Sequence, residues 1–173
     1  MEKAIYLITG LMASGKSTVA QLLCERLQKS VHLRGDVFRR MIVSGREDMR
    51  EDPPQEALEQ LYLRYQLTAE TAKAYFDHGF TVVMQDNYYG PALTHMQDFM
   101  AGYPLRIVVL CPDAQTIRSR DTARGKVGYT GFDLEPLYAS FMEETPHVGL
   151  WLDNSRQTPQ ETVDCVLRHT DWK

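Results

Sequence analysis

The stretch that decides the fold reads Gly10-Leu11-Met12-Ala13-Ser14-Gly15-Lys16-Ser17, which matches the pattern G-x-x-x-x-G-K-[ST] of a phosphate-binding loop (P-loop). Residues 4–9 before it are apolar, β-branched and aromatic, so they predict a buried strand. After the loop, apolar residues recur at helical spacing, namely Val19, Leu22, Leu23 and Leu27. A strand, a glycine loop and a helix in this order predict a site for nucleoside triphosphates.

Each residue type in this loop has a chemical reason. Glycines at both ends let the backbone bend and approach a ligand closely, and successive N–H groups then form an anion nest at a helix N-terminus. Lys16 is expected to reach the β- and γ-phosphates, and the Ser17 hydroxyl to bind Mg²⁺. The nucleotide contacts expected here are Gly10, Ala13, Ser14, Gly15, Lys16, Ser17 and Thr18. A plain glycine turn is the alternative, but such a match arises by chance in roughly one chain of this length in a hundred.

The composition is that of an ordinary globular protein of 173 residues, with 43% hydrophobic and 24% charged residues. This length suits a single domain over 1–173, and no apolar window is long enough to predict a membrane span. A net charge of −4 argues against nucleic acid as the main partner. We expect a cytoplasmic protein whose cysteines, Cys24, Cys111 and Cys165, are reduced. The sequence does not indicate the oligomeric state.

Strand-like and helix-like segments alternate along the whole chain. Strands are expected at 4–9, 31–33, 80–84, 105–110 and 150–153. This alternation predicts an α/β protein with a five-stranded parallel sheet and helices on both faces. Because ligands bind at the carboxyl ends of such strands, the polar residues that follow the strands are the candidates for chemistry.

The longest expected helix covers 56–78 and stops at Gly79. Its apolar face is predicted to consist of Leu58, Leu61, Tyr62, Tyr65, Ala69, Ala72 and Phe76. The polar segment 44–55 before it suits a loop over a site. Further helical patterns cover 113–124 and 135–144, and Thr158-Pro159-Gln160-Glu161 predicts a capping box at the start of the last helix.

Polar residues after the second and third strands carry the candidate acceptor chemistry. Asp36 is expected to take a proton from an attacking hydroxyl or to hold a water on Mg²⁺, with a helix N-cap as the alternative. Arg39 is expected to contact an anionic group of the substrate or of a phosphate. Asp86 is expected to bind substrate or to associate with Mg²⁺, with a turn-forming Asp-Asn pair as the alternative. Asn87 and Tyr88 are expected to line an acceptor pocket, or else to pack at the strand exit.

Basic residues gather at the end of the helix 113–124 and in the glycine-rich segment after it: Arg118, Arg120, Arg124 and Lys126. Because a phosphoryl-transfer transition state spreads charge over its equatorial oxygens, a closing arginine stabilises it. We therefore predict a lid at about 118–132, with Arg120 and Arg124 on one helix face as catalytic residues. An exposed basic helix face is the alternative. Arg156, after the last strand, is expected to stack on adenine.

Together these pieces resemble the small P-loop kinases that phosphorylate hydroxyls of metabolites or drugs. The closest resemblance is to the chloramphenicol phosphotransferase-like group, which is related to shikimate and gluconate kinases. It rests on Gly10–Thr18, on Asp36, on Asp86, and on Arg120-Asp121-Thr122-Ala123-Arg124-Gly125, which is similar to a lid of the form R-E-x-x-R-G. The resemblance implies the strand order 2-3-1-4-5, ATP with Mg²⁺, a base at Asp36 and a lid arginine at Arg124.

One departure from these relatives bears on the substrate. Some of them carry Asp-x-Asp after the second strand, where this chain has Arg34-Gly35-Asp36. This difference weakens the inference that the chain recognises a substrate as shikimate kinases do.

The leading hypothesis is ATP-dependent phosphoryl transfer to a hydroxyl of a small molecule, a metabolite or an antibiotic. The alternatives are a kinase for a nucleic-acid 5′-hydroxyl or a nucleotide sugar, similar to zeta-type toxins, and a nucleotide-binding regulatory protein without turnover.

Overall fold

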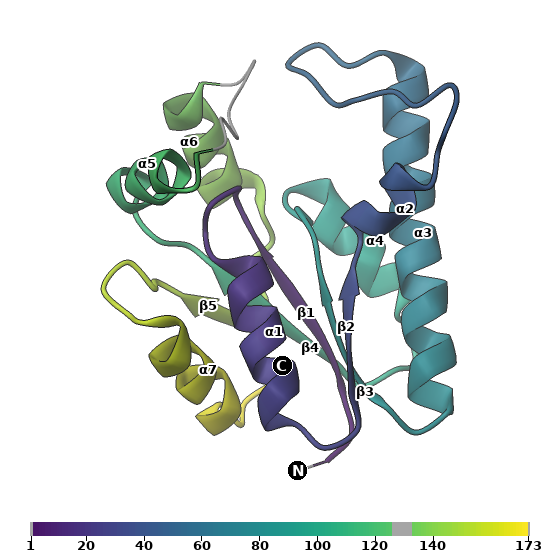
Figure 1. Cartoon of the computed structure of the whole chain (residues 1–173), viewed down its shortest axis with the longest axis vertical. Helices are drawn as coiled ribbons and strands as arrows, with labels where there is room; N and C mark the ends of the chain where they lie inside the picture. Colours follow the sequence, from purple (N-terminus) through teal and green to yellow (C-terminus); the bar gives the residue numbers. More distant parts are fainter. Residues whose placement is uncertain (1, 126–132, 173) are drawn as a thin grey trace.

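The computed structural model of the protein describes residues 2–125 and 133–172. A five-stranded parallel sheet in the order β2-β3-β1-β4-β5 forms its centre (Figure 1). The strands are β1 (Ile5–Gly10), β2 (Ser30–Arg34), β3 (Thr81–Gln85), β4 (Leu105–Leu110) and β5 (Leu150–Leu152). The predicted sheet and strand order are thus confirmed, with strand ends displaced by a residue or so.

Seven helices are described, and they connect the strands or follow the last one. They are α1 (Lys16–Arg26), α2 (Asp36–Arg40), α3 (Gln55–Asp77), α4 (Pro91–Phe99), α5 (Ala114–Ala123), α6 (Leu134–Glu144) and α7 (Pro159–Arg168). The predicted capping box is present at Thr158, whose side chain accepts from Glu161 N while the Glu161 side chain bonds back to Thr158 N. Within the described residues, no helix has both the length and the hydropathy needed to cross a membrane.

Each face of the sheet has its own apolar core, because successive side chains of a strand point to opposite sides. Ile5 and Leu7 of β1 pack with α3, α4, α5 and α6. Tyr6 and Ile8 of the same strand pack with α1 and α7 on the other face. β1 and β3 are buried along their whole length, as expected for central parallel strands covered on both faces.

The buried face of α3 differs from the predicted one. Leu58 and Tyr62 were expected in the core, but they are 42% and 45% exposed. The predicted Tyr65, Ala69 and Ala72 are buried, and the buried face also contains Ala57 and Thr68. Three of these are alanines, which let the helix lie close to the sheet, and Tyr62 is left on the flank. There its ring meets Phe99 edge-on, with centroids 5.3 Å apart.

All five strands run in one direction, so their carboxyl ends share one edge of the sheet. Above that edge, α2 and the upper part of α3 lie on one side, and α5 and α6 lie on the other (Figure 1). α2 is only five residues long. Residues 126–132 of the predicted lid, including Lys126, lie outside the described residues.

Two glycines away from the carboxyl ends of the strands test how closely the start of β5 approaches β4. Gly149 (φ +69°) precedes β5, and a Cβ there would lie 2.4 Å from Ile107 O, whereas Gly102 (φ +86°) has open space around it. Gly102→Ala should lower the free energy of unfolding by about 1 kcal/mol, the cost of a left-handed backbone alone. Gly149→Ala should cost about 3 kcal/mol because the clash is added. Urea denaturation measures both, and equal losses would contradict the close approach.

Candidate functional site

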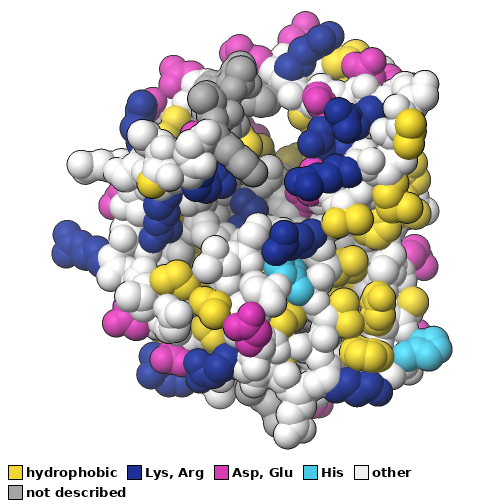
Figure 2. Space-filling view, viewed as in Figure 1, with side chains coloured by type: hydrophobic (Ala, Val, Ile, Leu, Met, Phe, Trp, Pro, Cys, Tyr) yellow, Lys and Arg dark blue, Asp and Glu magenta, His cyan; other side chains and the backbone are white. Residues whose placement is uncertain are grey.

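A cavity of about 1250 Å³ opens at the carboxyl ends of the strands. Figure 2 shows the hollow, with Lys and Arg side chains on both sides of it. One part, here called the nucleotide lobe, is lined by the P-loop, the end of α5, and Asn154, Gln157 and Pro159. The other part, the acceptor lobe, is lined by α2, residues 48–49, the upper part of α3, residues 85–87, Tyr89, residues 91–92 and Leu137.

The P-loop wraps around the side chain of Lys16. Its Nζ donates hydrogen bonds of 2.8 Å to both Gly10 O and Leu11 O. Gly10 takes φ +145°, and a Cβ there would lie 2.4 Å from Leu110 O, so only glycine fits against β4. Ala13 and Gly15 take φ +65° and +102°. Backbone in this left-handed conformation turns successive N–H groups inward, which agrees with the anion nest predicted from the motif.

Burial of the Lys16 ammonium has an electrostatic consequence. Desolvation lowers the pKa of Lys16 to about 7, the nearby Asp86 carboxylate raises it in part, and Arg124 lowers it. Burial removes water from the ammonium, and the two carbonyl dipoles compensate only partly. The empty loop therefore holds a lysine that is only partly charged near pH 7.

Of the other P-loop residues, Ala13, Gly15, Ser17 and Thr18 line the cavity, with Ser17 and Thr18 exposed. Gly10 and Ser14 do not line it. The Ser14 side chain is fully buried, and its carbonyl accepts two hydrogen bonds from the far side of the nucleotide lobe. The predicted loop is therefore divided between residues that face a ligand and residues that shape the backbone.

Asp36 lies in the acceptor lobe, but it is not the N-cap of α2, because Gly35 holds that position and Asp36 is the first helical residue. Arg39 Nε donates to Asp36 Oδ1 at 3.1 Å, and Arg40 Nε to Oδ2 at 2.6 Å. Partial burial by itself would raise the pKa of Asp36, but these hydrogen bonds outweigh it and lower the pKa. Arg39 also pairs with Asp48, a residue that the sequence did not single out.

Asp86 is a nearly buried carboxylate at the end of β3, 7% exposed. Arg64 of α3 holds it from two sides, with Nη2 2.9 Å from Oδ1 and Nε 2.9 Å from Oδ2. Asn87 N adds a 2.8 Å hydrogen bond to Oδ1. Burial raises the pKa of Asp86, while Arg64, Asn87 N–H and Lys16 work against that rise. A Cβ at Gly35 would lie 2.2 Å from Asp86 Oδ2, so the glycine makes room for the carboxylate.

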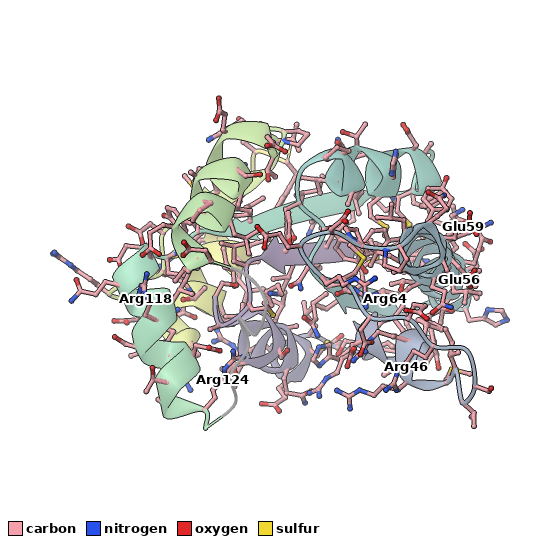
Figure 3. The ribbon with its side chains drawn as sticks, turned by 90° about the horizontal axis from the view of Figure 1, so that it is seen from above. Arg46, Glu56, Glu59, Arg64, Arg118 and Arg124 are labelled. Atoms are coloured by element: carbon pink, nitrogen blue, oxygen red, sulfur yellow. The ribbon has the colours of Figure 1, made fainter. Side chains whose placement is uncertain are left out.

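Sequence reasoning missed Arg64. It precedes the inward-facing Tyr65 in α3, beside the predicted apolar stripe, and its partner belongs to a different element. No motif links the two residues, so only the packing of α3 against β3 could show the pair. Figure 3 shows Arg64 and Arg124 on opposite sides of the opening.

The residues after Asp86 divide between the cavity and the core. Asn87 and Tyr89 line the acceptor lobe. The prediction that Tyr88 lines it is wrong, because Tyr88 is fully buried and its ring packs edge-on to Tyr65, with centroids 5.0 Å apart. Its carbonyl accepts from Thr9 Oγ1 at 2.7 Å, which ties this segment to β1. The alternation of side chains at the strand exit turns Tyr88 inward and its neighbours outward.

The two predicted catalytic arginines of α5 both line the nucleotide lobe, but they are held differently. Arg120 donates to Ser14 O at 3.2 Å and to Asn154 O at 2.8 Å. Arg120 therefore connects the P-loop to the segment after β5. Asn154 Nδ2 connects the same two segments with a 3.1 Å hydrogen bond to Ser14 O. Arg124 follows the last turn of α5 and pairs with Asp121.

Two other basic residues lie away from the cavity. Arg118 pairs with Glu135 of α6 and does not line either lobe. Arg156 is exposed and outside the lining, where Asn154, Gln157 and Pro159 stand instead. The predicted adenine contact of Arg156 is therefore not supported, because its side chain leaves the turn on the solvent side.

Comparison with known proteins identifies the family. Residues 5–136 match the family model described as AAA domain. Since this match covers more than half of the chain, the protein belongs to that family, and its sheet is that of a P-loop kinase fold. No curated protein matches the chain.

Several solved structures share this fold. A sugar kinase from a Janibacter species superposes with a TM-score of 0.70 at 19% identity, covering 96% of this chain and 93% of that one. The APS kinase of Mycobacterium tuberculosis with AMPPNP and APS gives 0.68 at 18% identity and 95% coverage of both chains. A chain of an RNA repair complex gives 0.60 at 16% identity, covering 99% of this chain and 47% of that one. At these identities the likeness shows the fold alone, and the closer resemblance to the chloramphenicol phosphotransferase-like group stays a prediction.

The lowered pKa of Lys16 predicts that nucleotide binding takes up a proton. In the empty loop Lys16 is mostly neutral at pH 8, and phosphates placed beside it favour the charged form. Uptake should approach one proton per ATP at pH 8 and fall towards zero at pH 6. Calorimetry of ATP·Mg²⁺ binding in Tris and in HEPES measures it. Lys16→Arg is the control, because a guanidinium stays charged throughout, and the same uptake by that variant would refute the assignment.

The Arg64–Asp86 pair predicts a large and pH-dependent stability effect. Arg64→Gln leaves a buried carboxylate without its cation, so the free energy of unfolding at pH 7 should fall by about 3 kcal/mol. The loss should shrink as the pH falls and Asp86 becomes protonated, since a neutral carboxyl needs no cation. Arg64→Gln combined with Asp86→Asn should recover much of the stability in urea denaturation. Additive losses in the double variant would show that the two side chains are not coupled.

Proposed function

We propose that the protein is an ATP-dependent kinase that transfers the γ-phosphoryl group to a hydroxyl of a small molecule. The observation that carries this proposal is a single cavity in which a P-loop with Lys16 and a carboxylate, Asp36, face a common space. Phosphoryl transfer needs a nucleotide cradle and an oriented acceptor in one chamber, because catalysis consists mainly of positioning and charge stabilisation. The fold shared with a sugar kinase and an APS kinase supports the same reaction class.

In the proposed mechanism, the P-loop N–H groups and Lys16 bind the β- and γ-phosphates. The acceptor hydroxyl oxygen attacks the γ-phosphorus, the bond from that phosphorus to the β,γ-bridging oxygen breaks, and ADP leaves with the electron pair. Asp36 accepts the hydroxyl proton. Its lowered pKa keeps it ionised near pH 7, and its two oxygens keep lone pairs free beside the arginine bonds.

The residues present also fit Mg²⁺. The Ser17 hydroxyl is exposed in the cavity, and the carboxylates of Asp36 and Asp86 lie in the same lining. Mg²⁺ prefers oxygen ligands and is usually held by one or two protein groups together with the substrate phosphates. When bound, it supplies neutralisation of phosphate charge. We propose that Arg124 adds a cation at the γ-phosphate, because Arg120 is already bonded to two carbonyls.

A second candidate is a kinase for a nucleic-acid 5′-hydroxyl, and it has one observation in its favour. The chain of the RNA repair complex shares the fold over 99% of this chain. Against it stands the net charge of −4, since proteins that bind nucleic-acid phosphates are usually basic. A short RNA therefore belongs in the acceptor panel. A regulatory protein that only binds ATP would bind the nucleotide but show no acceptor-stimulated ADP release.

The kinase proposal predicts separate defects for two variants. Lys16→Ala should abolish acceptor-dependent ADP release because the phosphates lose their cation. Asp36→Asn should lower transfer about a hundredfold or more while ATP still binds, because only the proton acceptor is removed. ADP release and calorimetric ATP binding measure the two effects against sugars, sugar acids, nucleosides, aminoglycosides, chloramphenicol and a short RNA.

The control for both variants is Asp164→Asn, which removes a surface carboxylate of α7 far from the lining. It should behave as the parent protein does. Full activity of Asp36→Asn would disprove its role as the base, and acceptor-dependent turnover by Lys16→Ala would disprove the site itself.

A further inference from the structure

The arginines that line the acceptor lobe are all neutralised within that lobe. Arg39 pairs with Asp36 at 3.1 Å and also with Asp48, while Arg40 pairs with Asp36 from the other side. Arg64 pairs with Asp86 at 2.9 Å. Three guanidinium groups of the lining thus face three carboxylates, and each charge has a partner of opposite sign in contact. Arg46, which is outside the lining, lies 3.8 Å from Asp48 as a further partner.

The nucleotide lobe is built in the opposite way. Lys16 and Arg120 donate to backbone carbonyls, and among the described residues neither forms an ion pair with a carboxylate. Arg124 pairs with Asp121, which is not part of the lining. Among the described residues, none of these three cations forms an ion pair with an acidic side chain of the lining, although the Asp86 carboxylate lies near enough to raise the pKa of Lys16. Such an arrangement suits a polyanion. The cavity separates a cationic half from a charge-balanced half.

The remaining wall of the acceptor lobe is mostly apolar, with Gln85 and Asn87 as its polar side chains. Besides the ion pairs it contains Met49, Leu61, Tyr65, Tyr89, Ala92 and Leu137. Tyr65 is 4% exposed and donates its hydroxyl to Asn87 O at 3.0 Å, so this hydroxyl is not free for a ligand. Ring faces and aliphatic side chains favour a ligand with an apolar surface.

We propose that the phosphate acceptor is an uncharged hydroxyl compound with an apolar face; this inference rests on the proposed function. An anion entering this lobe would find each guanidinium already neutralised and three carboxylates close by, so it would gain little Coulomb attraction. A neutral polyol or glycoside avoids that repulsion. Its hydroxyls fit between the N–H donors and the carboxylate oxygens of the ion pairs, and its apolar face lies on the Tyr89 and Leu137 side.

Matched pairs of acceptors that differ in the presence of an anionic group test the proposal. The pairs are p-nitrophenyl β-glucoside with p-nitrophenyl β-glucuronide, glucitol with gluconate, and adenosine with adenosine 3′-phosphate. Transfer of the γ-phosphate from ATP·Mg²⁺ is measured for each compound, with Lys16→Ala as the control. The uncharged members should have the higher kcat/KM, by about tenfold for the glycoside pair. A preference for the charged members would overturn the proposal.

A variant then tests the charge balance itself. Asp48→Asn removes one carboxylate of the lobe and leaves Arg39 partly unpaired, so the ratio of kcat/KM for glucoside over glucuronide should fall about fivefold. Glu51→Gln is the matched control, since Glu51 lies in the same segment, is exposed and does not line the cavity. Its ratio should equal that of the parent protein. An unchanged ratio in Asp48→Asn would refute the role assigned to charge pairing.

The outcomes separate this inference from the function beneath it. Lys16-dependent transfer to charged compounds alone would overturn the inference and leave the kinase proposal standing. Absence of transfer to every compound, with ATP still bound, would overturn both. Transfer to the uncharged set, with the ratio shifted in Asp48→Asn, would support both.

Discussion

The acceptor side of the cavity depends on one constraint, which is that the carboxylate of Asp86 is removed from water at the end of β3. Arg64 must come from α3 to neutralise it, and Asn87 N–H donates a further hydrogen bond to Oδ1. Gly35 must lack a side chain so that β2 can end beside it. A buried charge without these partners would cost several kcal/mol, so the ends of two strands and the position of a long helix are set together.

The same principle explains the difference between the two halves of the cavity. Lys16 and Arg120, the cations of the nucleotide lobe, are held by carbonyl groups, and in the part of the chain that the structure describes neither forms an ion pair. Cations that only shape a pocket are paired with carboxylates, as Arg39 and Arg64 are. Unpaired buried cations reduce the stability of the empty protein, and the lowered pKa of Lys16 is a measure of that cost. Binding of phosphate would recover it.

Much of the fold could be predicted because its signals are local. The glycine loop, the apolar run at Leu105–Leu110 and the capping box at Thr158 each depend on a few consecutive residues. Besides the P-loop and the two arginines of α5, the candidate site could be predicted where a polar residue comes soon after a strand, as Asp36 and Asp86 do. Tyr88 also follows a strand but turns into the core, because the pattern does not reveal which face a strand exit presents.

The sequence by itself determined that a strand, a P-loop and a helix stand at the start of a parallel α/β sheet, since backbone geometry and side-chain periodicity are local properties. Only the tertiary structure decided which cations meet partners on other elements. Arg64 meets Asp86, and Arg120 meets Ser14 and Asn154, through the packing of elements distant in the chain. The pairs of Asp36 with Arg39 and Arg40 follow helical spacing, but pairing between elements depends on distances that no spacing along the chain encodes. The electrostatic character of each lobe is therefore a property of the folded molecule.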